Sequence, residues 1–130
     1  MKGSLQYFLG TLDKEGYLIE SSRVTQNRMI RVLNYIEENY RDFKLSPYEI
    51  AEHENISYSH FSREFKSTMG VSFKTYLTNI RLKHSLNDLR YTKIPIIDVA
   101  MNNGFADIQS LIRACHKHTG MSPRKYRDRF

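Results

Sequence analysis

Apolar side chains recur at a helical period from Arg28 onward. The first run separates its apolar positions by three or four residues, which places them on one face of a helix: Met29, Val32, Leu33, Ile36 and Tyr40. Before Arg28, the apolar clusters at residues 5–12 and 17–19 flank the sequence Asp-Lys-Glu-Gly. This earlier pattern would suit a short helix or a hairpin, and it is too brief to choose between them.

Residues 45–66 predict two short helices joined by a tight turn, a helix-turn-helix. Ser46 with Glu49 three residues later forms a capping box, and Pro47 suits the first helical position. Asn55 can adopt the left-handed conformation that ends a helix. The second helix has a cap, two inward-facing residues and a stop: Ser57, Phe61 with Phe65, and Gly70.

This unit occurs a second time about fifty residues later. At an offset of 49 residues, chemically similar residues pair: Glu49, Ile50, Ala51 and Ile56 with Asp98, Val99, Ala100 and Phe105. At an offset of 50, four of the next five pairs are identical: Phe61, Arg63, Gly70, Ser72 and Tyr76 with Leu111, Arg113, Gly120, Ser122 and Tyr126. Two copies are too few for a solenoid, so the repeat predicts two related subdomains.

The second copy begins at Pro95, with its turn at Gly104 and the cap of its second helix at Asp107. Leu111 and Cys115 are expected to face inward, and Ser122-Pro123 should cap a last helix.

Between the copies, residues 72–90 predict one helix whose apolar face changes side. Four residues cluster on one face near its start: Phe73, Tyr76, Leu77 and Ile80. At about 100° per residue, Leu82, Leu86 and Leu89 cluster about 160° away. This is the pattern of a rigid connector between two small cores. The alternative is one long helix inside a single core.

In this order and spacing, a set of short motifs resembles the DNA-binding domain of the AraC/XylS family of bacterial transcription regulators, from about Arg28 to the end. The carrying residues are Ile50-Ala51, Phe65-Lys66, Gly70, Tyr76-Leu77, Arg81-Leu82, Val99-Ala100, Gly104-Phe105, Gly120-Met121-Ser122-Pro123 and Tyr126-Arg127. Three positions depart from the usual pattern, and all are small or apolar enough to pack: Ser85, Leu111 and Cys115.

The resemblance implies an all-α fold of about seven helices, with two helix-turn-helix subdomains joined by a long linker helix. Residues 28–71, 72–90 and 91–130 would be the first subdomain, the linker and the second subdomain of a DNA-binding domain at 28–130. Residues 1–27 would be a leader or the remnant of a preceding regulatory domain, and the chain could be a fragment. Implied partners are double-stranded DNA and, in addition, RNA polymerase. Dimerisation through an N-terminal or missing regulatory segment stays open.

Charge is distributed unevenly along the chain. The net charge is +6 over 130 residues, but residues 1–54 hold 7 basic and 9 acidic side chains, whereas residues 55–130 hold 13 and 5. Lys and Arg neutralise DNA phosphates, so the basic part is where DNA would bind. With one cysteine, no membrane-length apolar run and no signal-peptide pattern, we expect a cytoplasmic protein with no intramolecular disulfide. The resemblance implies that it is nucleoid-associated.

The exposed faces of the two second helices supply the candidate base contacts, at positions that match base-contacting positions of the family. They are Ser59, His60, Ser62, Arg63, Gln109, Ser110 and Arg113. Each Arg could instead clamp a phosphate or form a surface ion pair, as Arg63 would with Glu64 or Glu49. Candidate contacts to the DNA backbone are Ser57, Lys66, Ser72, Lys74, Arg81, Lys93, Lys117 and Arg124.

Catalytic, metal and cofactor sites receive no support from the pattern. Cys115 and His116 are adjacent in a helix and point about 100° apart. His116 and His118 have the wrong spacing for one helical face, and no Gly-rich phosphate loop is present. The remaining competitor is a helical module that binds the transcription machinery without sequence-specific DNA readout.

Overall fold

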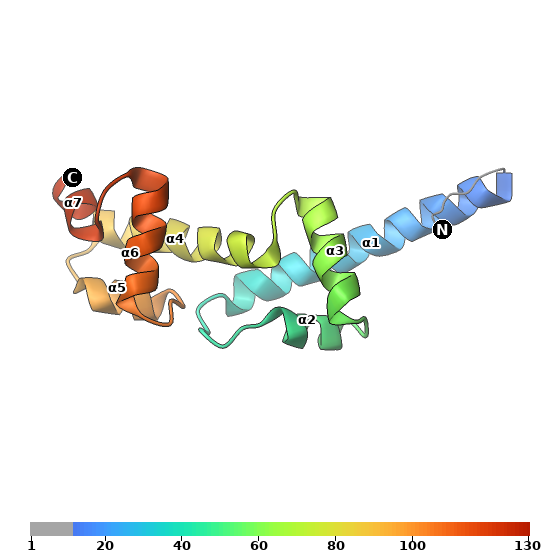
Figure 1. Ribbon diagram of the computed structural model, residues 1–130, viewed down its shortest axis with the longest axis horizontal. Helices are drawn as coiled ribbons and strands as arrows, with labels where there is room; N and C mark the ends of the chain where they lie inside the picture. Colours follow the sequence, from blue (N-terminus) through green and yellow to red (C-terminus); the bar gives the residue numbers. More distant parts are fainter. Residues whose placement is uncertain (1–11) are drawn as a thin grey trace. The chain divides into compact units, whose positions relative to one another are not determined.

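The computed structural model describes the backbone of residues 12–130 and the side chains of residues 22–130. Over that range the chain is all-α, as predicted, with seven helices and no strand (Figure 1). Their bounds are α1 Leu12–Asn39, α2 Pro47–His53, α3 Tyr58–Met69, α4 Phe73–Tyr91, α5 Ile96–Asn102, α6 Ile108–Thr119 and α7 Pro123–Asp128. None of these helices is both long enough and apolar enough to cross a membrane.

Helix α1 runs without interruption from Leu12 to Asn39. The expectation of a short separate helix or a hairpin is therefore wrong for residues 12–27, while residues 1–11 lie outside the described part. Extending an existing helix costs less free energy than nucleating a new one. The helix that forms over the strongly periodic residues after Arg28 can therefore continue through the less periodic residues before them. The chain forms two compact units, and the boundary between them lies between Tyr35 and Ile36, within α1. Both helix-turn-helix units belong to residues 36–130.

The first helix-turn-helix, α2 with α3, forms as the sequence predicts. The Ser46 hydroxyl accepts the Glu49 N–H at 3.2 Å, and Asn55 has a φ of 58° after the end of α2. The Ser57 hydroxyl then accepts the His60 N–H at 3.0 Å and starts α3. Phe61 and Phe65, one turn apart, are fully buried. Local capping thus sets the turn, and the two phenylalanines hold α3 in place.

The second helix-turn-helix, α5 with α6, repeats these features. Its turn contains Gly104 at a φ of 89°, and Asp107 caps α6 by accepting the Ser110 N–H at 2.8 Å. Leu111 and Cys115 have no solvent exposure. Both α3 and α6 have 12 residues, and a left-handed glycine, Gly70 or Gly120, ends each of them. The duplication predicted from the sequence is therefore structural.

Helix α4 connects two separate sets of buried side chains. Near its start, Phe73 packs edge-on against both Phe61 and Phe65, with ring centroids 5.8 Å apart in each pair. Its later residues Leu82 and Leu89 belong to a different core, in which the other buried members are Val99, Ala100, Phe105, Leu111, Ala114 and Cys115. The apolar face of α4 changes side as predicted, so a single long helix within one core is excluded.

Polar contacts fasten the small helices α5 and α7 onto α4. The buried Asn103 amide donates to the Asp88 carboxylate and to the Val99 carbonyl, both at 2.8 Å. The Arg127 Nε donates to the Leu89 carbonyl at 3.1 Å. These contacts satisfy polar groups next to the second core and fix how its helices meet the connector.

A compact junction joins the loop after α1, the middle of α4 and the turn of the second helix-turn-helix. Arg81 Nε donates to the Tyr40 carbonyl at 2.8 Å, and its Nη2 donates to the Asp42 carbonyl at 2.9 Å. Gly104 lies against the same carbonyl, since a Cβ there would overlap the Tyr40 oxygen and come 2.7 Å from Arg81 Nε. Ser85, fully buried one turn after Arg81, donates its hydroxyl to the Arg81 carbonyl at 2.8 Å. The family departures at Ser85, Leu111 and Cys115 are thus all accommodated in buried positions.

Replacing Gly104 with alanine should destabilise the protein far more than the same change at Gly70. Both residues have a left-handed backbone, which costs a non-glycine residue about 1–2 kcal/mol. At Gly70 the added methyl group would meet nothing within 4 Å, whereas at Gly104 it would collide with the junction. We expect a loss of about 1 kcal/mol for Gly70→Ala and about 3 kcal/mol for Gly104→Ala in urea unfolding. Equal losses would show that the close approach at Gly104 is dispensable.

Candidate nucleic-acid interface

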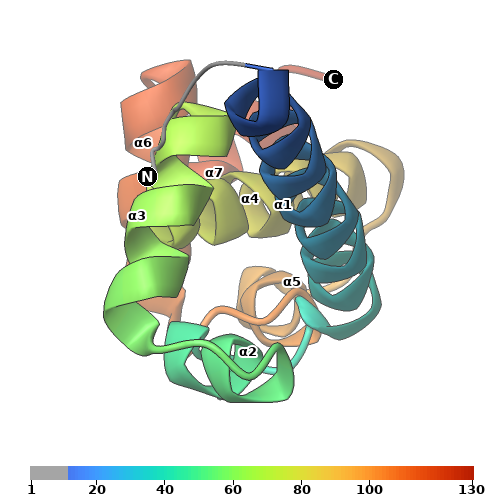
Figure 2. The same ribbon diagram turned by 90° about the vertical axis from the view of Figure 1, so that its right-hand side faces the viewer.

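The second helices of the two units, α3 and α6, lie on the same side of α4. Figures 1 and 2, viewed at right angles, agree on this placement. Each of these helices buries one face and leaves the other to solvent. Two similar helices are therefore displayed together, which is the arrangement needed to contact one extended partner.

The exposed face of α3 carries the four residues predicted for it. Ser59, Ser62 and Arg63 are all exposed. Among the described residues no hydrogen bond or ion pair engages the Arg63 guanidinium, so the suggested pairing with Glu64 or Glu49 is not formed. Glu64 instead lies 3.3 Å from the His60 ring nitrogen Nε2. Arg63 is thus exposed toward any ligand of this face, while His60 is held by its neighbour.

The exposed face of α6 is organised by a short network. The Ser110 hydroxyl donates to the Asp107 carboxylate at 2.8 Å and accepts from Arg113 Nη2 at 3.3 Å. Hydrogen bonds from the Ser110 backbone N–H and hydroxyl, with the nearby Arg113 charge, lower the pKa of the Asp107 carboxyl. Gln109 and Arg113 are exposed, whereas Ser110 is half-buried. Ser110, predicted to contact bases, therefore orients Arg113 in this structure.

The predicted DNA-backbone residues fall into three groups. Five cations are exposed: Lys66, Lys74, Lys93, Lys117 and Arg124. Ser57 and Ser72 use their hydroxyls to cap α3 and α4. Arg81 is half-buried at the junction, where burial lowers the pKa of its guanidinium. The exposed cations are free to meet phosphates, while Arg81 already has a structural task.

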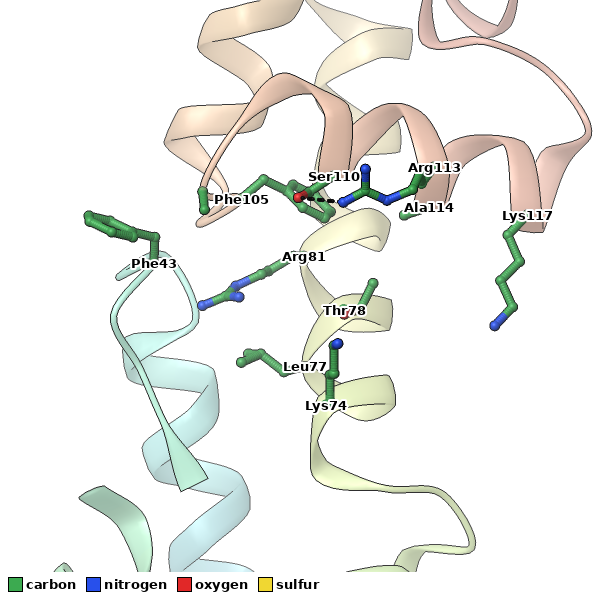
Figure 3. A pocket seen from close by; sticks show the side chains of 11 residues that line it. Phe43, Lys74, Leu77, Thr78, Arg81, Phe105, Ser110, Arg113, Ala114 and Lys117 are labelled. Atoms are coloured by element: carbon green, nitrogen blue, oxygen red, sulfur yellow. Dashed lines mark hydrogen bonds between the residues drawn. The ribbon is translucent and has the colours of Figure 1, made fainter. Parts of the chain in front are cut away.

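A cleft of about 370 Å³ opens between α4 and α6 (Figure 3). It brings together predicted residues of both kinds, Lys74 and Lys117 with Ser110 and Arg113. The lining residues that the sequence pattern does not single out are Phe43, Leu77, Thr78, Phe105, Ala106 and Ala114. The sequence could have indicated Thr78 as a cleft residue, because it follows Lys74 by one helical turn and lies on the same face of the helix. No sequence pattern indicates Phe43, since it lies in a distant loop.

The described residues offer no group of three or more His, Cys, Asp or Glu side chains that could hold a metal. The Cys115 thiol is fully buried, and burial raises its pKa. A thiol that stays protonated at neutral pH is a poor nucleophile.

Residues 50–129 match the family model described as a helix-turn-helix domain. Among curated relatives, an uncharacterized HTH-type transcriptional regulator of Staphylococcus aureus is 33% identical over 111 residues. The match covers 85% of this chain and 15% of that protein, so the chain spans a small part of the relative's length.

Several solved structures share this fold. The C-terminal domain of AraT, a response regulator from Geobacillus stearothermophilus, is 30% identical with a TM-score of 0.75, covering 79% of this chain and 85% of that one. An AraC-type regulator from Chromobacterium violaceum gives 22% identity and a TM-score of 0.69, covering 82% and 95%. The DNA-binding domain of AdpA, a global transcriptional factor crystallised with a target DNA, gives 22% and 0.72, covering 77% and 89%.

The duplicated fold and its two exposed helices define a helix-turn-helix DNA-binding domain of the kind found in transcription regulators. The matched model is the AraC-type helix-turn-helix, and the chain belongs to that family. The helices α3 and α6 are hereafter called the recognition helices.

Replacing Asp107 with asparagine should change how stability depends on pH. The Asp107 pKa is lowered in the folded protein. Its carboxylate therefore stabilises the fold above the ordinary carboxyl pKa of about 3.9, and this contribution is lost as the pH falls through the lower folded value. In urea unfolding, the difference between wild type and Asp107→Asn should be largest near neutral pH and should shrink in acid.

The matched control is Ser57→Ala, which removes the corresponding cap of α3 without removing a titratable group. It should cost about 1 kcal/mol at every pH. A difference for Asp107→Asn that stays constant from neutral to acidic pH would contradict the role assigned to its charge.

Proposed function

We propose that this chain regulates transcription by binding double-stranded DNA as a single asymmetric unit, with α3 and α6 in successive major grooves. The observation that carries the proposal is the display of both recognition helices on one side of α4, each with an exposed arginine (Figures 1 and 2). The unequal charge of the chain supports it, because the basic residues concentrate after residue 54, where both recognition helices lie.

Base readout would come from the exposed polar residues of the two helices. An α-helix fits the major groove, where each base pair presents its own pattern of donors and acceptors. The guanidinium groups of Arg63 and Arg113 can each donate two hydrogen bonds to guanine O6 and N7, and the Gln109 amide can pair with adenine. Each such bidentate contact contributes about 1–3 kcal/mol of discrimination. Ser59, His60 and Ser62 complete the α3 face.

The two helices differ in the residues they expose, so the DNA site should be asymmetric. The α3 face presents serines and a histidine, where α6 presents Gln109 and the Ser110–Arg113 pair. Successive major grooves on one side of B-DNA are about 34 Å apart. If the recognition helices are closer than that, the duplex must bend to meet both, and sequences that bend easily would be preferred.

Contacts to the DNA backbone would position the protein without specifying sequence. The exposed cations Lys66, Lys93 and Arg124 are assigned to this role, together with the cap residues Ser57 and Ser72 through the helix starts they form. Arg81 contributes indirectly, by holding the junction. RNA polymerase as a second partner, dimerisation through segments outside the described residues, and a cytoplasmic location at the nucleoid belong to the same proposal. The helix-turn-helix match disfavours a module that binds only protein.

A footprint on DNA selected from a random pool tests the two-groove arrangement. We expect a non-palindromic sequence of about two helical turns, with protection in two successive major grooves on one side of the duplex. Binding by one monomer should be evident from the stoichiometry. Protection confined to one groove, or a palindromic site bound by two copies, would overturn the proposal.

Substitution of the two arginines separates base readout from phosphate contact. Arg113→Ala should relax the preference at one base pair in one half of the site, and Arg63→Ala should do so in the other half. The expected loss is about 1–3 kcal/mol on the preferred sequence, or about 5- to 150-fold in affinity. Arg113→Lys serves as control, since it keeps the charge but loses the bidentate geometry. Uniform weakening on all sequences, rescued by lysine, would make Arg113 a phosphate contact.

A further inference from the structure

The cleft between α4 and α6 carries more positive charge than its surroundings neutralise. Four of its lining residues are cationic and none is acidic: Lys74 and Arg81 from α4, with Arg113 and Lys117 from α6. Two hydroxyl-bearing residues, Thr78 and Ser110, also line it. Figure 3 shows these residues lining one space from the two helices, with the Arg81 side chain turned toward Phe43 and the Arg113 side chain turned toward Ser110.

The four cations are not equally available. Two backbone carbonyls occupy Arg81, and Arg113 donates to Ser110 beside the Asp107 carboxylate. Lys74 and Lys117 are exposed, and among the described residues neither forms a hydrogen bond or an ion pair. The cleft therefore presents two ammonium groups without a partner among the described residues, beside two arginines whose guanidinium groups already donate hydrogen bonds.

The position of the cleft relates it to the proposed DNA surface. Lys117 follows Arg113 by one turn on α6, so the two side chains share a face. Lys74 lies in the first turn of α4, directly after the loop that leaves α3. A duplex whose bases contact Arg113 would bring its sugar–phosphate backbone within reach of the cleft. Lys, Arg, Ser and Thr side chains are the ones that usually contact that backbone.

We propose that this cleft is a phosphate-binding site for the DNA strand that crosses between the two major grooves. Lys74 and Lys117 contact the phosphate or adjacent phosphates, and the Thr78 and Ser110 hydroxyls lie beside them. One lysine belongs to the end of α4 nearest α3, and the other belongs to α6. A phosphate held by both fixes the duplex relative to the two recognition helices. This inference rests on the proposed function and assigns two of the predicted backbone contacts, Lys74 and Lys117, to one shared site.

The charge of the cleft favours this occupant over an acidic protein segment. Backbone phosphates provide regularly spaced negative charges on the same partner that Arg113 and Gln109 are proposed to contact. One DNA duplex could therefore occupy both the cleft and the exposed face of α6. An acidic segment of another protein would have to reach the cleft while leaving the α6 face clear.

The test compares the full chain with Lys74→Gln/Lys117→Gln and with the two single variants. Lys83→Gln is the matched control, because Lys83 is exposed on α4, about 180° around the helix from Lys74, and does not line the cleft. Affinity for the selected DNA is measured against salt concentration. Each lost phosphate contact should reduce the slope of log affinity against log salt by about 0.9, whereas Lys83→Gln should leave the slope unchanged. Base preferences should be the same in all variants.

Ethylation of single phosphates locates the contact. For the wild type, ethylation between the two protected grooves should interfere with binding, and the double variant should lose this interference while keeping interference elsewhere. A salt slope equal to that of Lys83→Gln, or unchanged interference between the grooves, would overturn the site and leave the cleft to a different partner such as an acidic protein segment. If the wild type selects no sequence at all, the proposed function itself fails, which is a separate result. Urea unfolding of each variant verifies that the fold is kept.

Discussion

The contact of the Arg81 guanidinium with two backbone carbonyls is the constraint on which the arrangement of the subdomains depends. It ties the middle of the connector to the loop after α1, through Tyr40 and Asp42. Gly104 approaches the same carbonyl from the second helix-turn-helix, and no larger residue would fit. Hydrogen bonds from a charged donor are stronger than neutral ones, and partly buried ones are shielded from competing water. The two halves of the domain therefore meet in one defined orientation.

Helix α4 links the cores of the two subdomains. Its first turns pack into the aromatic cluster of Phe61, Phe65 and Phe73, and its later turns pack into the core around Leu82 and Leu89. Because each core is fixed to the same helix, a rotation of one recognition helix relative to the other would require α4 to bend or the Arg81 junction to open. The orientation of the two recognition helices is therefore coupled to α4 and to the Arg81 junction.

The two recognition helices share a fold but differ in how their arginines are held. Arg113 donates to Ser110, which is itself held by the cap residue Asp107, so its side chain is oriented before any ligand binds. At the position equivalent to Ser110, α3 has His60, which pairs with Glu64 and leaves Arg63 unrestrained. Ordering a side chain in advance lowers the entropy lost on binding. The α6 face is thus the more preorganised of the two, and the α3 face is the more adaptable.

Sequence alone determined the parts of this protein that depend on neighbours in the chain. Caps such as Ser57 and Asp107 and the left-handed glycines arise from interactions within a few residues. The spacing of polar and apolar residues along each helix also records the inward phenylalanines, the change of side along α4 and the exposure of Arg63 and Arg113. The repeat and the family resemblance supplied the DNA-binding class. Tertiary structure decided the rest, because it joins residues about forty positions apart. Arg81, predicted as a phosphate contact, turns inward to Tyr40, and Lys74 and Lys117 line one cleft. A local pattern records which face of a helix is polar, but only the packed fold determines what that face meets.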